Sequence, residues 1–285
     1  MRALSLPGCA CRGAFQFAVV AKLIEAGERF DLVAGASSGS ICAATTVAGL
    51  AQRGPDFARS LADNPIFSPR YLRREKSPFG MGQILRETLR RNLPEELLHD
   101  TEAELLVATT HAKRYAVGFG PVRAGEPHAE SLVVHSNRTR KEMHEVILAS
   151  CFIPVLYAGV TRIDGEIHLD GAIADNTLLD ALAARGATEI TVVTPFPRGA
   201  VARTMFSPEA PLAARPGVRL RVIHPREPLA IGRFDLSRER LEQALTAPFE
   251  EQVIDPPSPP TAPPGPVSRG VSGRAEARPD RERTG

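Results

Sequence analysis

Short runs of hydrophobic residues alternate along the chain with longer segments in which hydrophobic positions recur every three or four residues. Residues 3–6 form the first short run, and helical spacing follows from residue 15 to 24. Residues 30–34 form the second run, and a segment of small residues follows from 41 to 50. Short apolar runs predict buried strands, and a period near 3.6 predicts helices. Two strand–helix units in this order predict a parallel sheet with helices on its faces.

The same pattern extends over most of the remaining chain. Residues 53–100 are broken by several prolines and contain one clear helical pattern near 84–93, so we expect them to form helical cover over the sheet. The run at 218–223 is predicted to be the last strand. A turn at Asp164-Gly165 predicts a hairpin within 163–169. Further strands are predicted at 104–109, 117–119, 132–135 and 189–194, and further helices at 141–151, 178–184 and 236–245.

The composition changes after Asp255. Prolines crowd together from residue 256 to 266, and arginines, acidic residues and glycines follow to the end. Such a segment cannot bury enough apolar surface to offset the entropy of ordering its chain. We therefore predict one folded domain over residues 1–254 and a disordered Pro/Arg-rich tail over residues 255–285.

Charge and cysteine content narrow the range of functions. The 285 residues are 43% hydrophobic, enough for a sizeable core, and the net charge of +2 gives no argument for a nucleic-acid partner. The four cysteines lack the spacing of a zinc site, so we expect free thiols, no metal and a cytoplasmic location. No run reaches the roughly 18 apolar residues of a membrane span, and the N-terminal apolar run is too short for a signal peptide. Membrane contact is therefore expected to be transient and peripheral.

The first candidate for chemistry lies at the turn after the second predicted strand. Gly35-x-Ser37-x-Gly39 follows a predicted strand and opens a predicted helix, which is the context of a nucleophile elbow. The glycines allow a tight, strained turn, and the helix N-terminus places positive potential near the serine oxygen. A glycine-rich turn with a purely structural role is the alternative interpretation.

Two further segments carry candidate chemistry. Asp170 ends a short predicted strand and is followed by Gly171 and Ala172, a position suited to a carboxylate that points into a cleft, although a simple Asp-Gly turn also fits. The loop from Gly8 to Gly13 joins a strand to a helix, where backbone N–H groups can form an anion-binding nest for an oxyanion. A phosphate-binding loop is the alternative, but neither G-x-G-x-x-G nor the P-loop pattern is present.

With these segments in this order, the chain over residues 2–254 resembles the patatin-like phospholipase family. Gly35, Ser37 and Gly39 match its serine motif, Asp170 with Gly171-Ala172 matches its aspartate motif, and the segment 149–154 resembles its Ala-Ser-x-x-x-Pro sequence. The glycine-rich oxyanion loop of the family corresponds to Gly8, Cys9, Ala10, Cys11, Arg12 and Gly13. The resemblance implies a three-layer α/β/α fold with a mainly parallel central sheet.

The resemblance also implies a mechanism. Ser37 would attack an acyl ester of a lipid, Asp170 would accept its proton, and the N–H groups of Cys9 and Ala10 would hold the oxyanion, with Arg12 fixing the loop. No metal or other cofactor is implied. Because an aspartate is a weak base at its ordinary pKa, burial would have to raise the pKa of Asp170.

The chain departs from the family pattern in two places. Cys9 and Ala10 stand where the family has glycine, which predicts strain if both need a positive φ and makes a weakly active or non-catalytic lipid-binding protein the main alternative. After Asp170, the segment 175–178 replaces the proline of the family's Asp-Asn-x-Pro turn. A second alternative is an α/β-hydrolase triad of Ser37, Asp170 and His224, but that fold needs more strands before its nucleophile than this chain provides.

Overall fold

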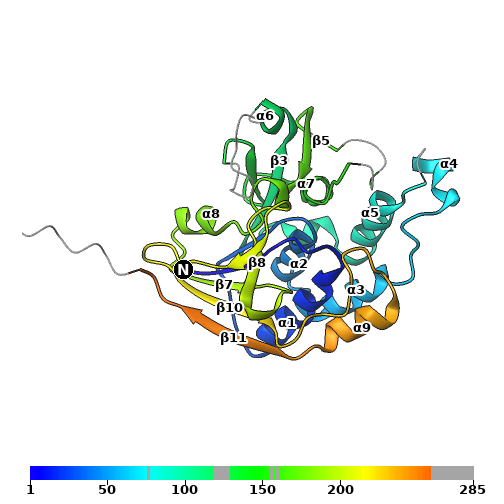
Figure 1. The fold of residues 1–285 in the computed structure, drawn as a ribbon. Coiled ribbons are helices and arrows are strands. Elements are labelled where there is room, and N and C mark those ends of the chain that lie inside the picture. The colour runs from blue at the N-terminus through cyan, green and yellow to red at the C-terminus, as the bar shows by residue number, and fades with distance from the viewer. Residues whose placement is uncertain (76–77, 118–128, 155–156, 158–160, 258–285) are drawn as a thin grey trace, which may run out of the picture.

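The computed structural model describes residues 1–75, 78–117, 129–154, 157 and 161–257 (Figure 1). Its strands are β1 (Arg2–Leu6), β2 (Leu32–Gly35), β3 (Glu104–His111), β4 (Leu132–Ser136), β5 (Arg162–Ile163), β6 (Glu166–Asp170), β7 (Glu189–Val193), β8 (Ala200–Ala202), β9 (Glu209–Pro211), β10 (Arg219–Pro225) and β11 (Phe249–Ile254). Its α-helices are α1 (Gly13–Glu25), α2 (Ser38–Val47), α3 (Gly54–Leu61), α4 (Leu72–Glu75), α5 (Met81–Asn92), α6 (Ala112–Val117), α7 (Met143–Ser150), α8 (Leu179–Ala184) and α9 (Arg238–Thr246).

The central sheet has the strand order β11-β10-β7-β1-β2-β3-β6-β5, and β4 also pairs with β3. Strands β10, β7, β1, β2 and β3 are parallel, whereas β4, β6 and β11 are antiparallel to their neighbours. Helices cover both faces, as Figure 1 shows. The predicted α/β fold with a mainly parallel central sheet is therefore confirmed.

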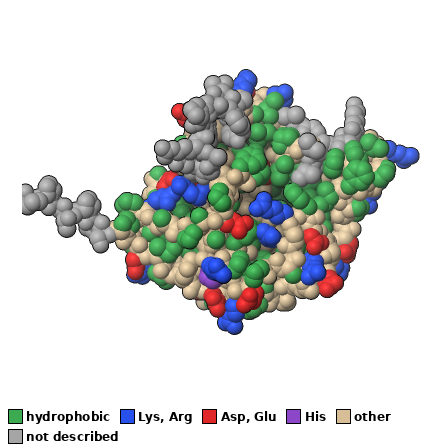
Figure 2. Space-filling model, in the orientation of Figure 1, with side chains coloured by type: hydrophobic (Ala, Val, Ile, Leu, Met, Phe, Trp, Pro, Cys, Tyr) green, Lys and Arg blue, Asp and Glu red, His purple; other side chains and the backbone are tan. Residues whose placement is uncertain are grey.

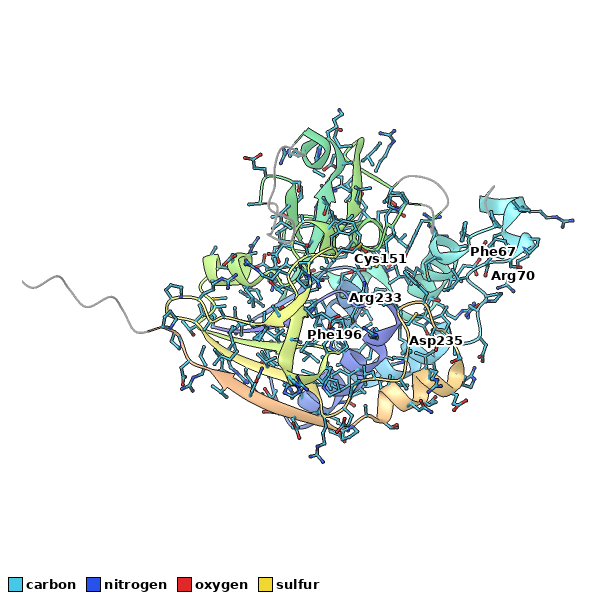
Figure 3. The ribbon with its side chains drawn as sticks, in the orientation of Figure 1. Phe67, Arg70, Cys151, Phe196, Arg233 and Asp235 are labelled. Atoms are coloured by element: carbon cyan, nitrogen blue, oxygen red, sulfur yellow. The ribbon has the colours of Figure 1, made fainter. Side chains whose placement is uncertain are left out.

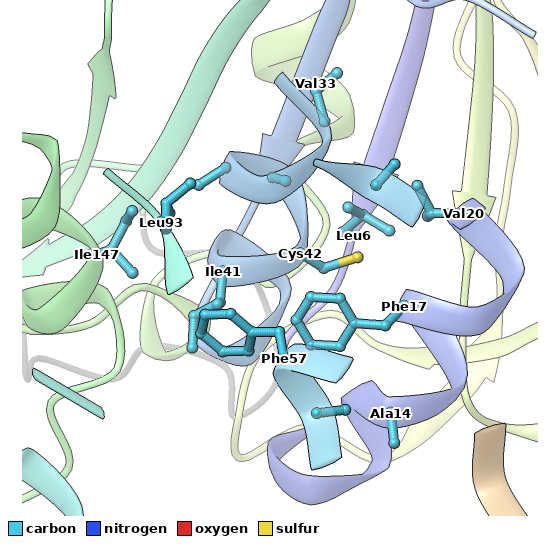
Figure 4. Packing of buried hydrophobic residues seen from close by; sticks show 14 of the residues in the cluster. Leu6, Ala14, Phe17, Val20, Val33, Ile41, Cys42, Phe57, Leu93 and Ile147 are labelled. Carbon is cyan, nitrogen blue, oxygen red and sulfur yellow. The ribbon is translucent and has the colours of Figure 1, made fainter. Parts of the chain in front are cut away.

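Each face of the sheet has its own hydrophobic core. The larger core lies under α1, α2, α3, α5, α7 and α9, and Phe17 stacks on Phe57 within it at 5.5 Å between ring centroids (Figure 4). The smaller core packs Leu178 and Leu182 of the α8 region against the opposite face. The small residues of α2, including Cys42 and Ala43, are fully buried, which lets this helix pack closely on the strands that precede it.

Strand β3 aligns two segments that are distant in the sequence. Its residues Glu104–Val107 pair with β2, and Gly35 lies opposite Val107. Its next residues pair with β6 in the antiparallel sense, and Asp170 lies opposite Thr109. The end of β2 and the end of β6 are therefore two residues apart along one strand.

The structure corrects one predicted strand, and two further predictions fall wholly or partly on residues that it does not describe. The strand at 218–223 is not the last, because β11 pairs antiparallel with β10 at the edge of the sheet. Its sequence lacks a continuous apolar run because one side of the strand, which carries Glu251 and Val253, faces solvent. In the predicted strand at 117–119, Val117 is instead the last residue of α6, and residues 118 and 119 lie outside the described residues. Residues 258–285 of the predicted tail also lie outside the described residues. Within the described part of the chain, no helix is long and apolar enough to cross a membrane.

Candidate active site

The turn between β2 and α2 holds Ser37 in a strained conformation. Ser37 has φ 52° and ψ −131°, a combination that costs energy in an ordinary residue and is typical of functional sites. The flanking glycines are required by close packing, because a Cβ atom at Gly39 would overlap the carbonyl of Leu6 and one at Gly35 would overlap the carbonyl of Gly39. The serine therefore stands at the N-terminus of α2, where the helix dipole is positive.

The structure brings Ser37 and Asp170 into direct contact. The Ser37 hydroxyl donates a hydrogen bond of 2.6 Å to Asp170 Oδ2, and the Ala172 N–H donates one of 2.8 Å to Asp170 Oδ1. Asp170 is completely buried, and this burial raises its pKa from 3.8 to about 7, although the two hydrogen bonds oppose the shift. Its carboxylate is thus a competent proton acceptor near neutral pH, in a position where it can reach the serine proton directly.

The segment 149–154 supports both residues through buried contacts. Ser150 Oγ accepts a 2.9 Å hydrogen bond from the Ser37 N–H, and Ser150 is fully buried. The Asp170 N–H donates to the Phe152 carbonyl at 2.9 Å. The sequence pattern singled out this segment, but it did not predict that Ser150 holds the backbone of Ser37.

The loop that begins at Gly8 is anchored at both ends. Asn176 Oδ1 accepts the Gly8 N–H at 2.6 Å, and Asn176 Nδ2 donates to the Gly8 carbonyl at 3.3 Å. At the other end, the Arg12 guanidinium donates to the Ile231 carbonyl at 3.2 Å and lies 5.1 Å from the Phe196 ring centroid. Gly13 follows as the first residue of α1. The departure at 175–178 therefore leaves a working anchor, since Asn176 is retained.

The two residues that replace glycine in this loop differ from each other. Ala10 has φ 54°, in the left-handed region, whereas Cys9 has φ −153°, outside that region. The predicted strain therefore applies to Ala10 and not to Cys9. The Cys9 N–H donates to Ser38 Oγ at 3.0 Å, and the Cys11 N–H donates to the Arg233 carbonyl at 3.0 Å. For the Ala10 N–H we find no acceptor among the residues that the structure describes.

Two apolar pockets meet at Ser37. The first runs between α1, α3, α5 and α9, where side chains such as Phe17, Leu85 and Leu241 line it. The second lies over the loop of residues 8–13 and is bounded by Phe196 and Met205. Figure 3 shows Phe196, Arg233 and Cys151 near one another beside the strand ends. The sequence alone did not predict either pocket, because their walls come from segments far apart in the chain.

The histidine of the alternative triad does not reach this site, and the cysteines near it are not nucleophiles at neutral pH. His224 lies on β10, its Nδ1 is 3.1 Å from the Pro225 carbonyl, and it lines neither pocket, whereas the Ser37 hydroxyl bonds to Asp170. Cys9, Cys11, Cys42 and Cys151 are free thiols. Burial raises the pKa of Cys9 and of Cys11 to about 12, so both stay neutral near pH 7. Among the described residues, no group of three or more His, Cys, Asp or Glu side chains is placed to hold a metal ion.

The fold and the site define a class of protein: a three-layer α/β protein with a serine on a strained turn at the carboxyl end of a central strand of a mainly parallel sheet, and a buried aspartate beside it. The model of the patatin-like phospholipase family matches residues 4–183, more than half of the chain, and the chain belongs to this family. Membership supports lipid acyl hydrolase activity in general.

Comparison with solved structures gives a similarity to VipD from Legionella pneumophila. The two share 16% sequence identity with a TM-score of 0.37, and the match covers 69% of this chain and 50% of that chain. The chain thus spans half the length of the VipD chain. A search of curated proteins gave no match.

Proposed function

We propose that the protein is a serine lipid acyl hydrolase, of the phospholipase A or esterase type, in which Ser37 and Asp170 form a catalytic dyad. The observation that carries the proposal is the 2.6 Å hydrogen bond from Ser37 to a buried carboxylate whose pKa is raised to about 7, at the junction of two apolar pockets. A serine hydroxyl needs such a base to become a useful nucleophile. Apolar walls suit an acyl chain, which gains about 0.8 kcal/mol for each CH₂ group that it buries.

The proposed reaction has two stages. Ser37 Oγ attacks the ester carbonyl while Asp170 accepts its proton, and the tetrahedral intermediate then collapses with cleavage of the bond to the alcohol, which leaves with that proton. The product of this stage is an acyl-Ser37 ester. In the second stage Asp170 takes a proton from a water molecule, which attacks the acyl carbonyl; the bond to Ser37 Oγ then breaks, Ser37 Oγ takes that proton back from Asp170, and the fatty acid is released. The Ala10 N–H and the N-terminus of α2 supply positive potential for the oxyanion in both stages.

The proposal is tested by active-site labelling and by hydrolysis. A fluorophosphonate probe should label the wild-type protein and leave Ser37→Ala unlabelled, while Ser60→Ala, which removes a hydroxyl on α3, should be labelled like the wild type. The same proteins are assayed with p-nitrophenyl butyrate and with a phospholipid in detergent micelles. Labelling that persists in Ser37→Ala would refute the nucleophile assignment.

The second candidate is a lipid-binding protein with slow or no turnover. Two observations favour it: Ser38 already accepts the Cys9 N–H, and Ala10 adopts a strained φ. Under this candidate the wild-type protein binds lipid but neither reacts with the probe nor releases fatty acid. The same two assays therefore separate the two candidates.

A further inference from the structure

Both pockets beside Ser37 share one charged side chain. Arg233 lines both pockets together with Ala10, Ser37 and Phe234. Every other described residue that lines either pocket is uncharged. A polar group of a bound lipid near Ser37 therefore has one cationic partner at the point where the two pockets join.

The backbone of Arg233 is held next to the oxyanion loop. Its carbonyl accepts the Cys11 N–H at 3.0 Å, and Arg12 donates to the carbonyl of Ile231 two residues earlier. The guanidinium also lies close enough to Cys9 to oppose the rise in the pKa of that thiol, which burial dominates. Figure 3 shows Arg233 in front of the strand ends, and Figure 2, in the same orientation, shows positive charge next to hydrophobic side chains on that part of the face.

The Arg233 guanidinium is available to a ligand. Its ion pair with Glu209 is long, at 3.8 Å, and the two side chains are 54% and 38% exposed. Exposed ion pairs of this kind contribute little free energy. A ligand oxygen at the mouth of the pockets can therefore replace Glu209 at small cost.

We infer that Arg233 selects the substrate by binding a phosphate group next to the scissile ester, so that the enzyme prefers glycerophospholipids to neutral acylglycerols. This inference rests on the proposed function. The planar guanidinium matches two phosphate oxygens at once, which a neutral glyceride cannot offer. The apolar walls accept the acyl chains of both lipids equally. The preference for one lipid over the other therefore depends on the contact between Arg233 and the phosphate.

The test compares two lipids with identical acyl chains, phosphatidylglycerol and diacylglycerol, each at the same mole fraction in nonionic detergent micelles. The ratio of their kcat/KM values should fall about ten- to hundredfold in Arg233→Gln, as expected for the loss of a charge-assisted contact. Arg233→Lys should restore part of the ratio. The matched control is Arg219→Gln, which removes an exposed arginine at the first residue of β10. This variant should keep the wild-type ratio. Thermal melts establish that each variant is folded.

Several results would overturn the inference. One is a ratio that does not change in Arg233→Gln, and another is an equal fall in Arg219→Gln, which would show a general effect of surface charge. A third is a change confined to inhibition by free oleate, which would show that Arg233 binds the carboxylate of the product. If no lipid is hydrolysed, the proposed function fails, and binding decides the inference: Ser37→Ala protein should bind micelles of a diether phosphatidylglycerol more tightly than the Ser37→Ala, Arg233→Gln protein, and equal binding would refute it.

Discussion

Replacing Asp170 with asparagine should lower turnover by orders of magnitude and also stabilise the fold. Asparagine has the same shape, its Oδ1 can accept the Ala172 N–H, and its amide can donate to Ser37 Oγ. What changes is the charge, because the folded protein holds the carboxyl at a pKa of about 7 against an ordinary value of 3.8. An interval of about three pH units, at 1.36 kcal/mol each, corresponds to a destabilisation on the order of 4 kcal/mol when the group is ionised.

The sign of this effect follows from proton binding. Between pH 4 and pH 7 the folded state holds a proton on Asp170 that the unfolded state has lost, so wild-type stability declines as pH rises through this range. Urea unfolding should therefore give similar stabilities for Asp170→Asn and wild type at pH 4, and a gain for Asp170→Asn at pH 8. Turnover of p-nitrophenyl butyrate should fall about 10²–10⁴-fold, the usual value of a general base.

The pH profile of the wild type provides an independent measurement. Because only the ionised carboxylate accepts the serine proton, kcat/KM should fall about tenfold per pH unit below pH 7 and level off above it. Asp175→Asn is the matched control, since Asp175 is also buried with a raised pKa but bonds to Thr177 and Leu178. A flat profile between pH 5 and 8, or a stability gain in Asp170→Asn that is the same at pH 4 and pH 8, would refute the reasoning.

Three further predictions concern the loop and the tail. Ala10→Gly should relieve about 1 kcal/mol of backbone strain and raise the melting temperature by about 2–4 °C, whereas Cys9→Gly should not, and equal shifts in calorimetry would contradict the difference in φ. Asn176→Ala should lower kcat for p-nitrophenyl butyrate at least tenfold because Gly8 loses its anchor, and an unchanged kcat in folded protein would show that the loop needs no such support. Deletion of residues 258–285 should leave the melting temperature unchanged, and a clear drop would show that the predicted tail packs on the domain.

The hydrophobic pattern alone predicted the parallel strands of the central sheet. Strands such as β1 and β7 are buried on both faces, so their sequences are mainly apolar, with only the small polar residues Ser5 and Thr191 between the apolar ones. The edge strand β11 was missed for the opposite reason. Its Glu251 and Val253 are exposed, so its sequence shows neither an apolar run nor a clear alternation.

The candidate site was only partly accessible to sequence reasoning. Ser37 and Asp170 could be selected because their motifs encode local turns, and the family pattern gave their order. The φ angles that distinguish Cys9 from Ala10 depend on how the loop packs, and no local pattern separates the two residues. Arg233 carries no motif at all, and its place beside Ser37 follows from the path of a loop near the end of the fold.

Strand β3 determines how the two site segments lie relative to each other. Val107 pairs with Gly35 at the end of β2, and Thr109 pairs with Asp170 at the end of β6. The 133 positions that separate Ser37 from Asp170 in the sequence therefore do not determine the distance between their side chains. Natural or engineered changes of length in the intervening loops should be tolerated as far as this geometry is concerned. A single residue inserted between Val107 and Thr109 would shift one partner relative to the other and turn Asp170 to the opposite face of the sheet. The segments around the pockets can therefore vary in length and sequence while the pairing of Val107 and Thr109 in β3 stays the same.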